Sequence, residues 1–257
     1  MNILDAIVER KRVEVLRRKQ KRPLSNLAAM PGYRRRTNGI LLPVEGRAGI
    51  IAEFKRKSPS RGMINRDADP LEVAGGYAAA GAAAVSILTD RDFFGGSLRD
   101  LLGVRQQFPE LPLLRKDFII DPYQLHEASA YGADLVLLIA AILEKGEVAD
   151  LVLEARSLDM QVLLELHGEE ELEKYDPAIG YVGVNNRDLK TFRVDTATSI
   201  RLAGRLPREA VWVSESGIST REDLETLSEA GFRLFLMGER FMREPDPGAA
   251  CRKFMTT

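Results

Sequence analysis

The sequence contains few residues that would support disulfide, metal or redox chemistry. Its 257 residues include one cysteine, Cys251, and two histidines, His126 and His167. A lone cysteine excludes an intramolecular disulfide and any site with several thiolate ligands, which fits a reducing compartment. Neither histidine has a partner at metal-ligand spacing, so we interpret both as structural or surface residues and expect no metal site.

Long apolar runs are also missing. No apolar stretch approaches the roughly 20 residues that a helix needs to cross a bilayer. The opening residues lack the basic-then-apolar layout of a signal peptide. We therefore expect no membrane partner and a cytoplasmic location.

The two signs of charge are unevenly distributed along the chain, and the first fifth has an excess of positive charge. The net charge is −1, but residues 1–47 hold 12 Lys and Arg against 4 Asp and Glu, a net of +8. Such an arm is most often a solvated helix face, although basic arms also bind nucleic acid, acidic membranes or phosphorylated ligands. Apolar residues at Ile3, Leu4, Ile7 and Val8 predict an amphipathic helix that ends near Pro23. We predict a helical extension over residues 1–47.

From Gly49 onward, strand patterns and helical patterns alternate. The predicted strands are 50–54, 84–88, 111–115, 134–139, 161–166, 181–184, 211–214 and 234–237. The predicted helices are 70–80, 98–108, 122–131, 145–158, 169–175, 196–206, 221–230 and 247–255. Strands this apolar are buried on both faces, which indicates parallel pairing with helical crossovers.

Eight such units favour one particular α/β fold, a closed (β/α)8 TIM barrel, over an open doubly wound sheet. No Gly-x-Gly-x-x-Gly follows the first strand, so dinucleotide binding has little support. We predict a single domain over residues 1–257, in which 48–257 form the barrel and 1–47 the extension.

Charged and polar residues follow most of the predicted strands. Active sites of such barrels lie at the carboxyl ends of the strands, so these residues are the candidates. Side chains alternate along a strand, so Glu53 and Lys55 should point the same way, and buried charges should be paired or functional. The other polar candidates at strand ends are Lys116, Glu165, Asn185, Arg187, Glu215 and Ser216.

Glycine-containing turns after the last two strands suit a phosphate group. Backbone N–H groups and a short helix often bind phosphate there, and Ser216-Gly217 and Gly238-Glu239 fit that pattern, with Ser58 in reach from the first strand. Acid–base chemistry would then depend on Lys and Glu, whose pKa values respond to burial and neighbours.

Several alternatives stay open from the residues alone. Glu165 could be paired structurally, and Asn185 could simply form a turn. A lysine inside the barrel could form a Schiff base, as in an aldolase. The basic arm could bind nucleic acid, although it lacks the features of the familiar modules.

The sequence resembles the indole-3-glycerol phosphate synthase family of tryptophan biosynthesis. The matching segments appear in order and span nearly the whole chain after Gly49. They are Ile51-Ala52-Glu53-Phe54-Lys55, Ser58-Pro59-Ser60-Arg61-Gly62, Ser86-Ile87-Leu88-Thr89-Asp90, Phe93-Phe94-Gly95-Gly96-Ser97, Leu114-Arg115-Lys116-Asp117-Phe118, Gly183-Val184-Asn185-Asn186-Arg187-Asp188-Leu189, Ser214-Glu215-Ser216-Gly217-Ile218, and Gly238-Glu239 with Met242-Arg243.

The resemblance implies a lyase that needs no cofactor and acts on a small phosphorylated substrate. That substrate is 1-(2-carboxyphenylamino)-1-deoxyribulose 5-phosphate, which undergoes ring closure, decarboxylation and dehydration. By resemblance, Lys116 is the general acid, Lys55 beside Glu53 assists, and Glu165 is the carboxylate base. Asn185 and Glu215 are polar neighbours in the catalytic group. The resemblance places the aromatic ring against Phe94, Phe118 and Leu137, the phosphate on Ser58, Ser216, Gly217, Gly238 and Glu239, and Arg187 as a bridge across the site.

The chain departs from the family after Gly238-Glu239. The family usually has a small residue there, followed by Leu-Met, whereas this sequence has Arg240-Phe241-Met242. This departure leaves the geometry of the phosphate turn open, and we favour an Arg240 side chain that points away and pairs with an acidic neighbour. Either a monomer or a homodimer would fit the sequence, and we expect no nucleic-acid partner.

Overall fold

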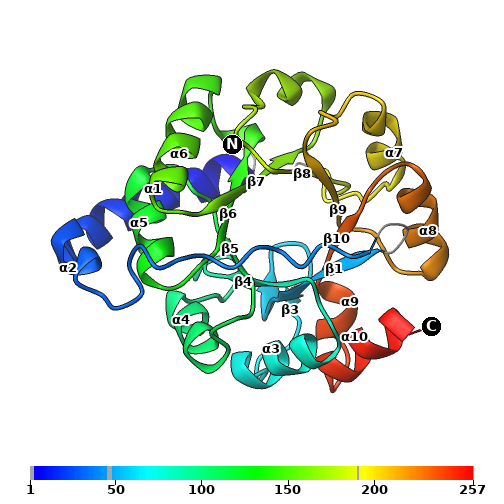
Figure 1. The fold of residues 1–257 in the computed structure, drawn as a ribbon, viewed down its shortest axis with the longest axis horizontal. Helices are drawn as coiled ribbons and strands as arrows, with labels where there is room; N and C mark the ends of the chain where they lie inside the picture. Colours follow the sequence, from blue (N-terminus) through cyan, green and yellow to red (C-terminus); the bar gives the residue numbers. More distant parts are fainter. Residues whose placement is uncertain (1–2, 45–47, 190, 257) are drawn as a thin grey trace.

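Eight parallel strands close into a barrel in the computed structural model, which describes residues 3–44, 48–189 and 191–256 (Figure 1). The strands are β1 (Gly49–Phe54), β4 (Ala84–Leu88), β5 (Leu113–Lys116), β6 (Leu135–Ile139), β7 (Gln161–Leu166), β8 (Tyr181–Asn185), β9 (Val211–Glu215) and β10 (Leu234–Met237). Each pairs in parallel with the next, and β10 pairs with β1 to close the ring. The predicted (β/α)8 barrel is confirmed.

Helices surround the barrel in the expected order. They are α3 (Pro70–Ala79), α4 (Leu98–Gln107), α5 (Pro122–Ala130), α6 (Lys145–Ser157), α7 (Ala197–Ala203), α8 (Arg221–Glu229), α9 (Glu239–Met242) and α10 (Pro247–Thr256), with 3₁₀ turns η1 (Ala140–Ile142) and η2 (Glu169–Lys174). Local sequence starts two of them in the same way. Asp69 and Asp121 accept hydrogen bonds from first-turn N–H groups, and a proline follows each at the first helical position. None of the described helices is long and apolar enough to cross a membrane.

The strand boundaries differ from prediction mainly at β5, which begins at Leu113 rather than Leu111. Pro112 has no N–H to donate to a neighbouring strand, and the N–H of Leu111 instead bonds to the carbonyl of Phe108 in a turn. The segment after β7 is the 3₁₀ turn η2 and contains no α-helix. The sequence analysis also missed α2 (Leu24–Ala28) and the short hairpin of β2 (Lys57–Ser58) and β3 (Gly62–Met63).

The predicted N-terminal helix is α1 (Ile3–Lys21), and it lies across the end of the barrel where the strands finish. Ile3, Leu4 and Ile7 pack into the apolar cluster inside the barrel. After α2 the chain returns along the opposite end, where the N–H of Leu41 bonds to the carbonyl of Ala83. The extension therefore contacts both ends of the barrel.

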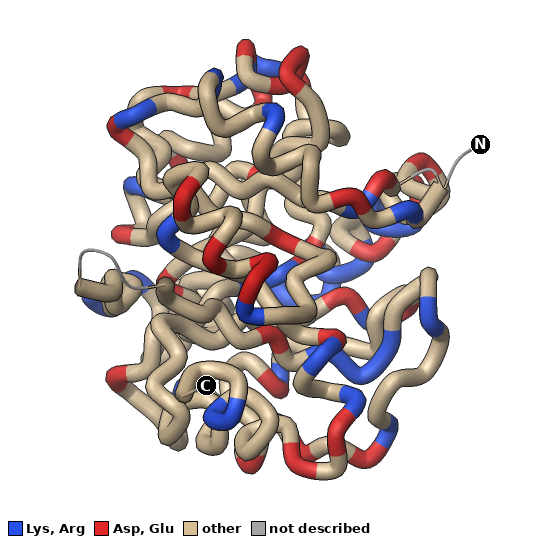
Figure 2. Tube along the Cα trace, turned by 90° about the vertical axis from the view of Figure 1, so that its right-hand side faces the viewer, with Lys and Arg blue, Asp and Glu red and all other residues tan. Residues whose placement is uncertain are grey.

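The opposite charges of arm and barrel meet where α1 packs (Figure 2). Lys11 is buried, with its ammonium 2.8 Å from both Asp90 and Asp117. Further along α1, Lys19 pairs with Asp121 at 2.7 Å. Much of the basic character of the arm is thus matched by carboxylates at the ends of β4 and β5 and at the start of α5.

Candidate active site

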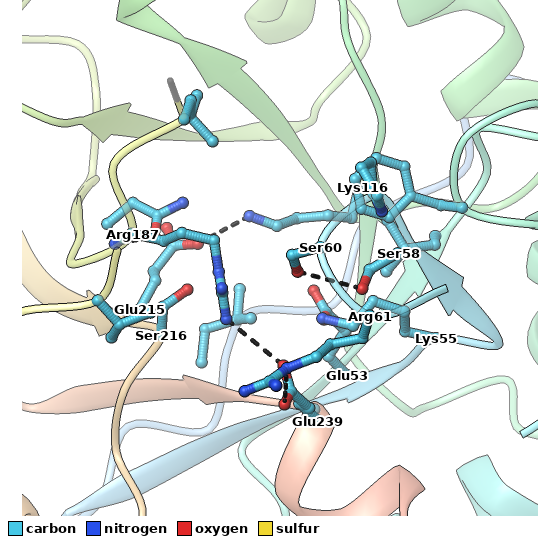
Figure 3. Close-up of a pocket in the computed structure, with 18 of the residues that line it drawn as sticks. Glu53, Lys55, Ser58, Ser60, Arg61, Lys116, Arg187, Glu215, Ser216 and Glu239 are labelled. Atoms are coloured by element: carbon cyan, nitrogen blue, oxygen red, sulfur yellow. Dashed lines mark hydrogen bonds and ion pairs between the residues drawn. The ribbon is translucent and has the colours of Figure 1, made fainter. Parts of the chain in front are cut away.

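A cavity of ≈ 620 Å³ opens at the carboxyl ends of the strands (Figure 3). All of the residues that the sequence analysis proposed for the site line it. They are Glu53, Lys55, Ser58, Phe94, Lys116, Phe118, Leu137, Glu165, Asn185, Arg187, Glu215, Ser216, Gly217, Gly238 and Glu239.

The register of the barrel explains why these side chains meet. One apolar cluster takes residues from all eight strands and fills the barrel interior, including Ile51 of β1, Leu114 of β5 and Leu163 of β7. Because side chains alternate, the residue two positions later on each strand also points inward. Those residues are Glu53, Lys116 and Glu165, and the same step from Val213 leads to Glu215 and from Tyr181 through Gly183 to Asn185.

Lys116 occupies the centre of the polar group. Its ammonium lies 2.8 Å from Glu165 Oε2 and 2.7 Å from Glu215 Oε2. Burial alone would lower the pKa of Lys116, but the carboxylates of Glu165 and Glu215 outweigh it and raise that pKa above its ordinary value. Lys116 is therefore a firmly protonated ammonium in the unliganded site.

The two carboxylates that share Lys116 differ in their surroundings. Burial raises the pKa of Glu165, but Lys116 and His167 outweigh it, so the pKa of this carboxyl is lowered. The pKa of Glu215 is instead raised, to about 7, by burial and by the neighbouring Glu165. Asn185 Nδ2 donates to Glu165 Oε1 at 3.2 Å, whereas Glu215 Oε1 is buried without a hydrogen-bond partner among the described residues.

Glu53 and Lys55 lie on the same side of the chain, as strand alternation predicts. Lys55 Nζ is 2.6 Å from Glu53 Oε1. Gly238 makes room for this pair, because a Cβ at that position would lie 2.7 Å from Glu53 Oε1. Gly183 does the same for the other carboxylate, since its Cβ would come within 2.4 Å of Glu215 Oε1. The requirement for these two glycines is steric.

An apolar wall faces the charged group. The rings of Phe94 and Phe118 are 5.9 Å apart between centroids, and Leu137 lines the cavity beside them. Ile3, Leu4 and Ile7 of α1 extend this wall, although the sequence analysis did not assign them to the site. One side of the cavity is therefore suited to a flat apolar group.

The opposite side is polar and built from turns. Ser58 lies in β2, and Ser216 and Gly217 follow β9 with φ of 64° and 83°. A side chain on Gly217 would be strained by that φ and would lie 2.6 Å from Val194. The backbone of this turn therefore requires Gly217, and both Ser216 and Gly217 line the cavity.

The carboxylate of Glu239 is engaged by arginines. It lies 3.0 Å from Arg61 Nε and 3.4 Å from Arg187 Nη2, and it also pairs with Arg243 (Figure 3). A phosphate could therefore contact Glu239 only through its backbone N–H and not through its carboxylate. As a first-turn helical group, this N–H has no intrahelical partner. Arg187 thus connects the segment after β8 to the first residue of α9.

Arg240 is one of the residues around the cavity, and among the described residues the neighbour of its guanidinium is a ring and not a carboxylate. Its guanidinium carbon lies 5.0 Å from the ring centroid of Phe254 on α10. The stacking partner is thus aromatic, and the expected pairing with an acidic residue is wrong.

Arg240→Ala should leave substrate affinity almost unchanged, because the guanidinium is held on the ring of Phe254 in α10. We expect KM within about twofold of the original, since a lost hydrogen bond to a charged group would cost about 1.5–3 kcal/mol and raise KM far more. Steady-state kinetics measures this, and a tenfold rise in KM would contradict the position of Arg240.

The two histidines have different surroundings. His126 stacks on Tyr33 and lies 3.1 Å from Glu154, outside the cavity, as a structural or surface residue would. His167 instead has Nε2 only 3.4 Å from Glu165 Oε1. The sequence analysis missed this proximity, although strand alternation from Glu165 to the residue two places later could have revealed it.

Within residues 3–44, 48–189 and 191–256, no group of three or more His, Cys, Asp or Glu side chains could hold a metal ion. The absence of metal and cofactor from the reaction stays a prediction.

Comparisons with known proteins agree on one family. The sequence profile described as "Indole-3-glycerol phosphate synthase" matches residues 4–254. A protein of that name from Bacteroides thetaiotaomicron is 47% identical, over 99% of this chain and 98% of its own. Another of that name from an Acidovorax species is 50% identical, over 80% of this chain and 79% of its own.

Solved structures show the same fold at low identity. The 3-hexulose-6-phosphate synthase from Salmonella typhimurium is 11% identical with a TM-score of 0.65, and the match covers 81% of this chain and 97% of that one. This likeness concerns the fold alone, whereas the sequence relatives cover the site residues as well. On the family profile and these relatives, the chain belongs to the indole-3-glycerol phosphate synthase family.

Proposed function

We propose that the chain converts 1-(2-carboxyphenylamino)-1-deoxyribulose 5-phosphate into indole-3-glycerol phosphate, with the roles that its resemblance implied. The observation that carries this proposal is the position of Lys116 in the cavity. Its ammonium is held between Glu165 and Glu215, with an apolar wall on one side and glycine turns on the other. A substrate with an aromatic ring at one end and a phosphate at the other would extend from the apolar wall to the glycine turns.

Lys116 would act as the general acid. The reaction begins when a ring carbon attacks the ketone, whose oxygen must take up a proton. Lys116 enters the reaction protonated, because Glu165 and Glu215 raise its pKa. When the ketone oxygen gains electron density, a nearby ammonium can both stabilise the charge and donate the proton.

Lys55 and Glu165 would serve the later steps. Lys55, oriented by Glu53, would bind the carboxylate that leaves as carbon dioxide and would assist dehydration. Glu165 stays ionised, since its pKa is lowered, so it can accept the proton that dehydration releases and stabilise the cationic ring nitrogen. Asn185 would hold the Glu165 carboxylate in position through its hydrogen bond.

The ends of the substrate would be held by opposite walls. Phe94, Phe118 and Leu137 would contact the aromatic ring. The phosphate would accept hydrogen bonds from Ser58, from the Ser216-Gly217 turn and from the backbone at Gly238 and Glu239. We propose that the chain acts in the cytoplasm on this small molecule, as a monomer or homodimer, without a nucleic-acid or membrane partner.

The aldolase alternative requires a neutral lysine, because only the free amine attacks a carbonyl. The raised pKa of Lys116 works against that role. Borohydride trapping with an aldehyde substrate would reveal a Schiff base if one formed.

The direct test is incubation of the purified protein with the carboxyphenylamino sugar phosphate while indole absorbance is recorded. We expect absorbance to rise and to stop rising when the substrate is exhausted. A chain that leaves this substrate unchanged under conditions where a family relative consumes it would refute the proposal.

Activity should survive dialysis against a chelator, because Lys and Glu supply the acid–base chemistry and no metal-binding cluster occurs in the part of the chain that the structure describes. The rate before and after dialysis measures this. A loss that a divalent ion restores would show that the reaction depends on metal.

A further inference from the structure

His167 lies directly behind the carboxylate that we propose as the base. It directly follows β7, two residues after Glu165, and its side chain is only 15% exposed. Nε2 is 3.4 Å from Glu165 Oε1, and Nδ1 is 3.9 Å from Glu171 Oε2. Its backbone N–H donates to that same oxygen of Glu171 at 2.7 Å, which fixes the turn between β7 and η2.

Lys116 cannot by itself distinguish the two carboxylates it contacts. Its distances to Glu165 and Glu215 differ by 0.1 Å (2.8 and 2.7 Å). Two buried carboxylates that share one ammonium titrate as a pair, and one of them tends to keep a proton. Something other than Lys116 must decide which one.

The second oxygens of the two carboxylates supply the difference. Glu165 Oε1 receives Asn185 at 3.2 Å and faces His167 at 3.4 Å. Glu215 Oε1 is buried and has no hydrogen-bond partner in the described parts of the chain. Asn185 offers only a neutral donor, so among the residues that the structure describes His167 is the group beside Glu165 Oε1 that can add a full positive charge.

We infer that His167 is a positioning residue that carries a proton in the working enzyme and thereby assigns the base role to Glu165 and the proton to Glu215. The inference rests on the proposed function only where it calls Glu165 the base. The arrangement of charges does not depend on the proposed function. With Glu215 protonated, the two cations Lys116 and His167 face the two anions Glu165 and Glu171. The buried group is then electrically balanced.

The titratable groups around His167 come from three elements. They are Glu165 on β7, Glu171 on η2 and Glu215 on β9, and Lys116 reaches the far oxygen of Glu165. Burial lowers the pKa of His167, but Glu171 and Glu165 outweigh it, so the pKa is raised above its ordinary value of 6.5. The pKa of His126 is lowered by burial, so the pKa values of the two histidines should be shifted in opposite directions from 6.5.

The first test uses the fact that the chain has only two histidines. Ring-nitrogen NMR on the full chain gives two titrations, and His126→Asn assigns them. We expect His167 to titrate above 6.5 and His126 below it, and Glu165→Gln should lower the pKa of His167. A His167 that titrates below His126, or that ignores Glu165→Gln, overturns the inference.

The second test is the pH profile of kcat/KM. His167→Asn removes the charge but keeps the backbone bond to Glu171, so the pKa of Glu165 should rise. A nearby opposite charge shifts a carboxyl pKa by about 1–3 units, so the acidic limb should move to higher pH by about one unit. His167→Lys should restore the limb, and the matched control His126→Asn should leave it in place.

The outcomes separate this inference from the proposed function. If His167→Asn has a normal fold and an unmoved acidic limb, His167 has only a structural role. If His167→Asn does not fold, the NMR titrations of the unchanged chain and of Glu165→Gln still decide. If the chain forms no indole product, the proposed function fails, whereas the titrations test His167 without any turnover.

Discussion

Lys116→Ala should lower kcat by about 10²–10⁴-fold, the usual contribution of a general acid. The ammonium that we propose as the proton donor lies between Glu165 and Glu215, and no other described residue contacts both carboxylates through an ammonium. Loss of the cation leaves two buried carboxylates side by side. Since the pKa of Glu215 is already raised to about 7, that group can take up a proton and keep the fold intact.

The measurement is steady-state turnover, with circular dichroism and the unfolding midpoint as checks of the fold. Lys116→Met keeps the aliphatic stem and should lose as much activity, because the charge and the proton matter rather than the volume. Lys145→Ala, on the exposed start of α6, is the matched control and should retain full activity. If Lys116→Ala keeps more than about a tenth of kcat, Lys116 is not the general acid.

Lys11→Met should destabilise the protein by about 3–5 kcal/mol, the usual cost of removing one partner from a buried ion pair. Lys11 is 1% exposed, and its ammonium joins α1 to Asp90 and Asp117 of the barrel. Asp90 also accepts hydrogen bonds from the N–H groups of Phe93 and Phe94, so the same change should loosen the apolar wall. We therefore expect a lower free energy of unfolding together with a higher KM.

Urea denaturation measures this cost, and Arg12→Ala provides the control. The Arg12 side chain is 66% exposed, and its ion pair with Glu9 is long at 4.0 Å and exposed. Its loss should therefore change stability by less than about 0.5 kcal/mol. A Lys11→Met variant as stable as Arg12→Ala would contradict the proposed role of the arm.

The difference in the free energy of unfolding between Lys11→Met and the original chain should shrink as the pH falls into the acidic range. Burial raises the pKa of Asp117, but Lys11 and Arg115 outweigh it, so the pKa in the folded protein lies well below the ordinary range. A lowered carboxyl pKa stabilises the fold above the unfolded pKa of about 3.9, and this contribution is lost as the pH falls further. The loss in stability caused by Lys11→Met should therefore be constant from about pH 5 up to the unfolded lysine pKa of about 10.4, and shrink outside that range, because the pKa of Lys11 is raised in the folded protein.

The arm also shows how far sequence reasoning extends. The +8 charge of residues 1–47 and the amphipathic pattern from Ile3 to Val8 correctly indicated a basic helix. They did not indicate that Lys11 would be buried, because lysine is rarely buried unless it is paired, and here it lies on the buried helix face between Ile7 and Val15. The carboxylates that bury it come from loops about 80 and 106 residues further along the chain, at Asp90 and Asp117.

The site residues illustrate the same division. Strand alternation was enough to place Glu53 and Lys55 together, because neighbouring residues share one local geometry. It could not place Lys116 between Glu165 and Glu215, because that contact depends on the register of strands β5, β7 and β9 around a closed ring. His167 was missed because its lack of a metal-ligand partner drew attention away from its neighbour on the same strand face.

The sequence by itself determined the eight strands, most of the helices between them, the polar strand ends and the family resemblance, since these depend on local periodicity and on motifs that are read directly. Tertiary structure alone decided which charges are paired. It matched the basic arm to the acidic barrel ends, placed the Glu239 carboxylate among three arginines and turned Arg240 onto Phe254. The pKa values of Lys116, Glu165 and Glu215 likewise follow from burial and from distances of a few ångströms, which arise only when the barrel closes.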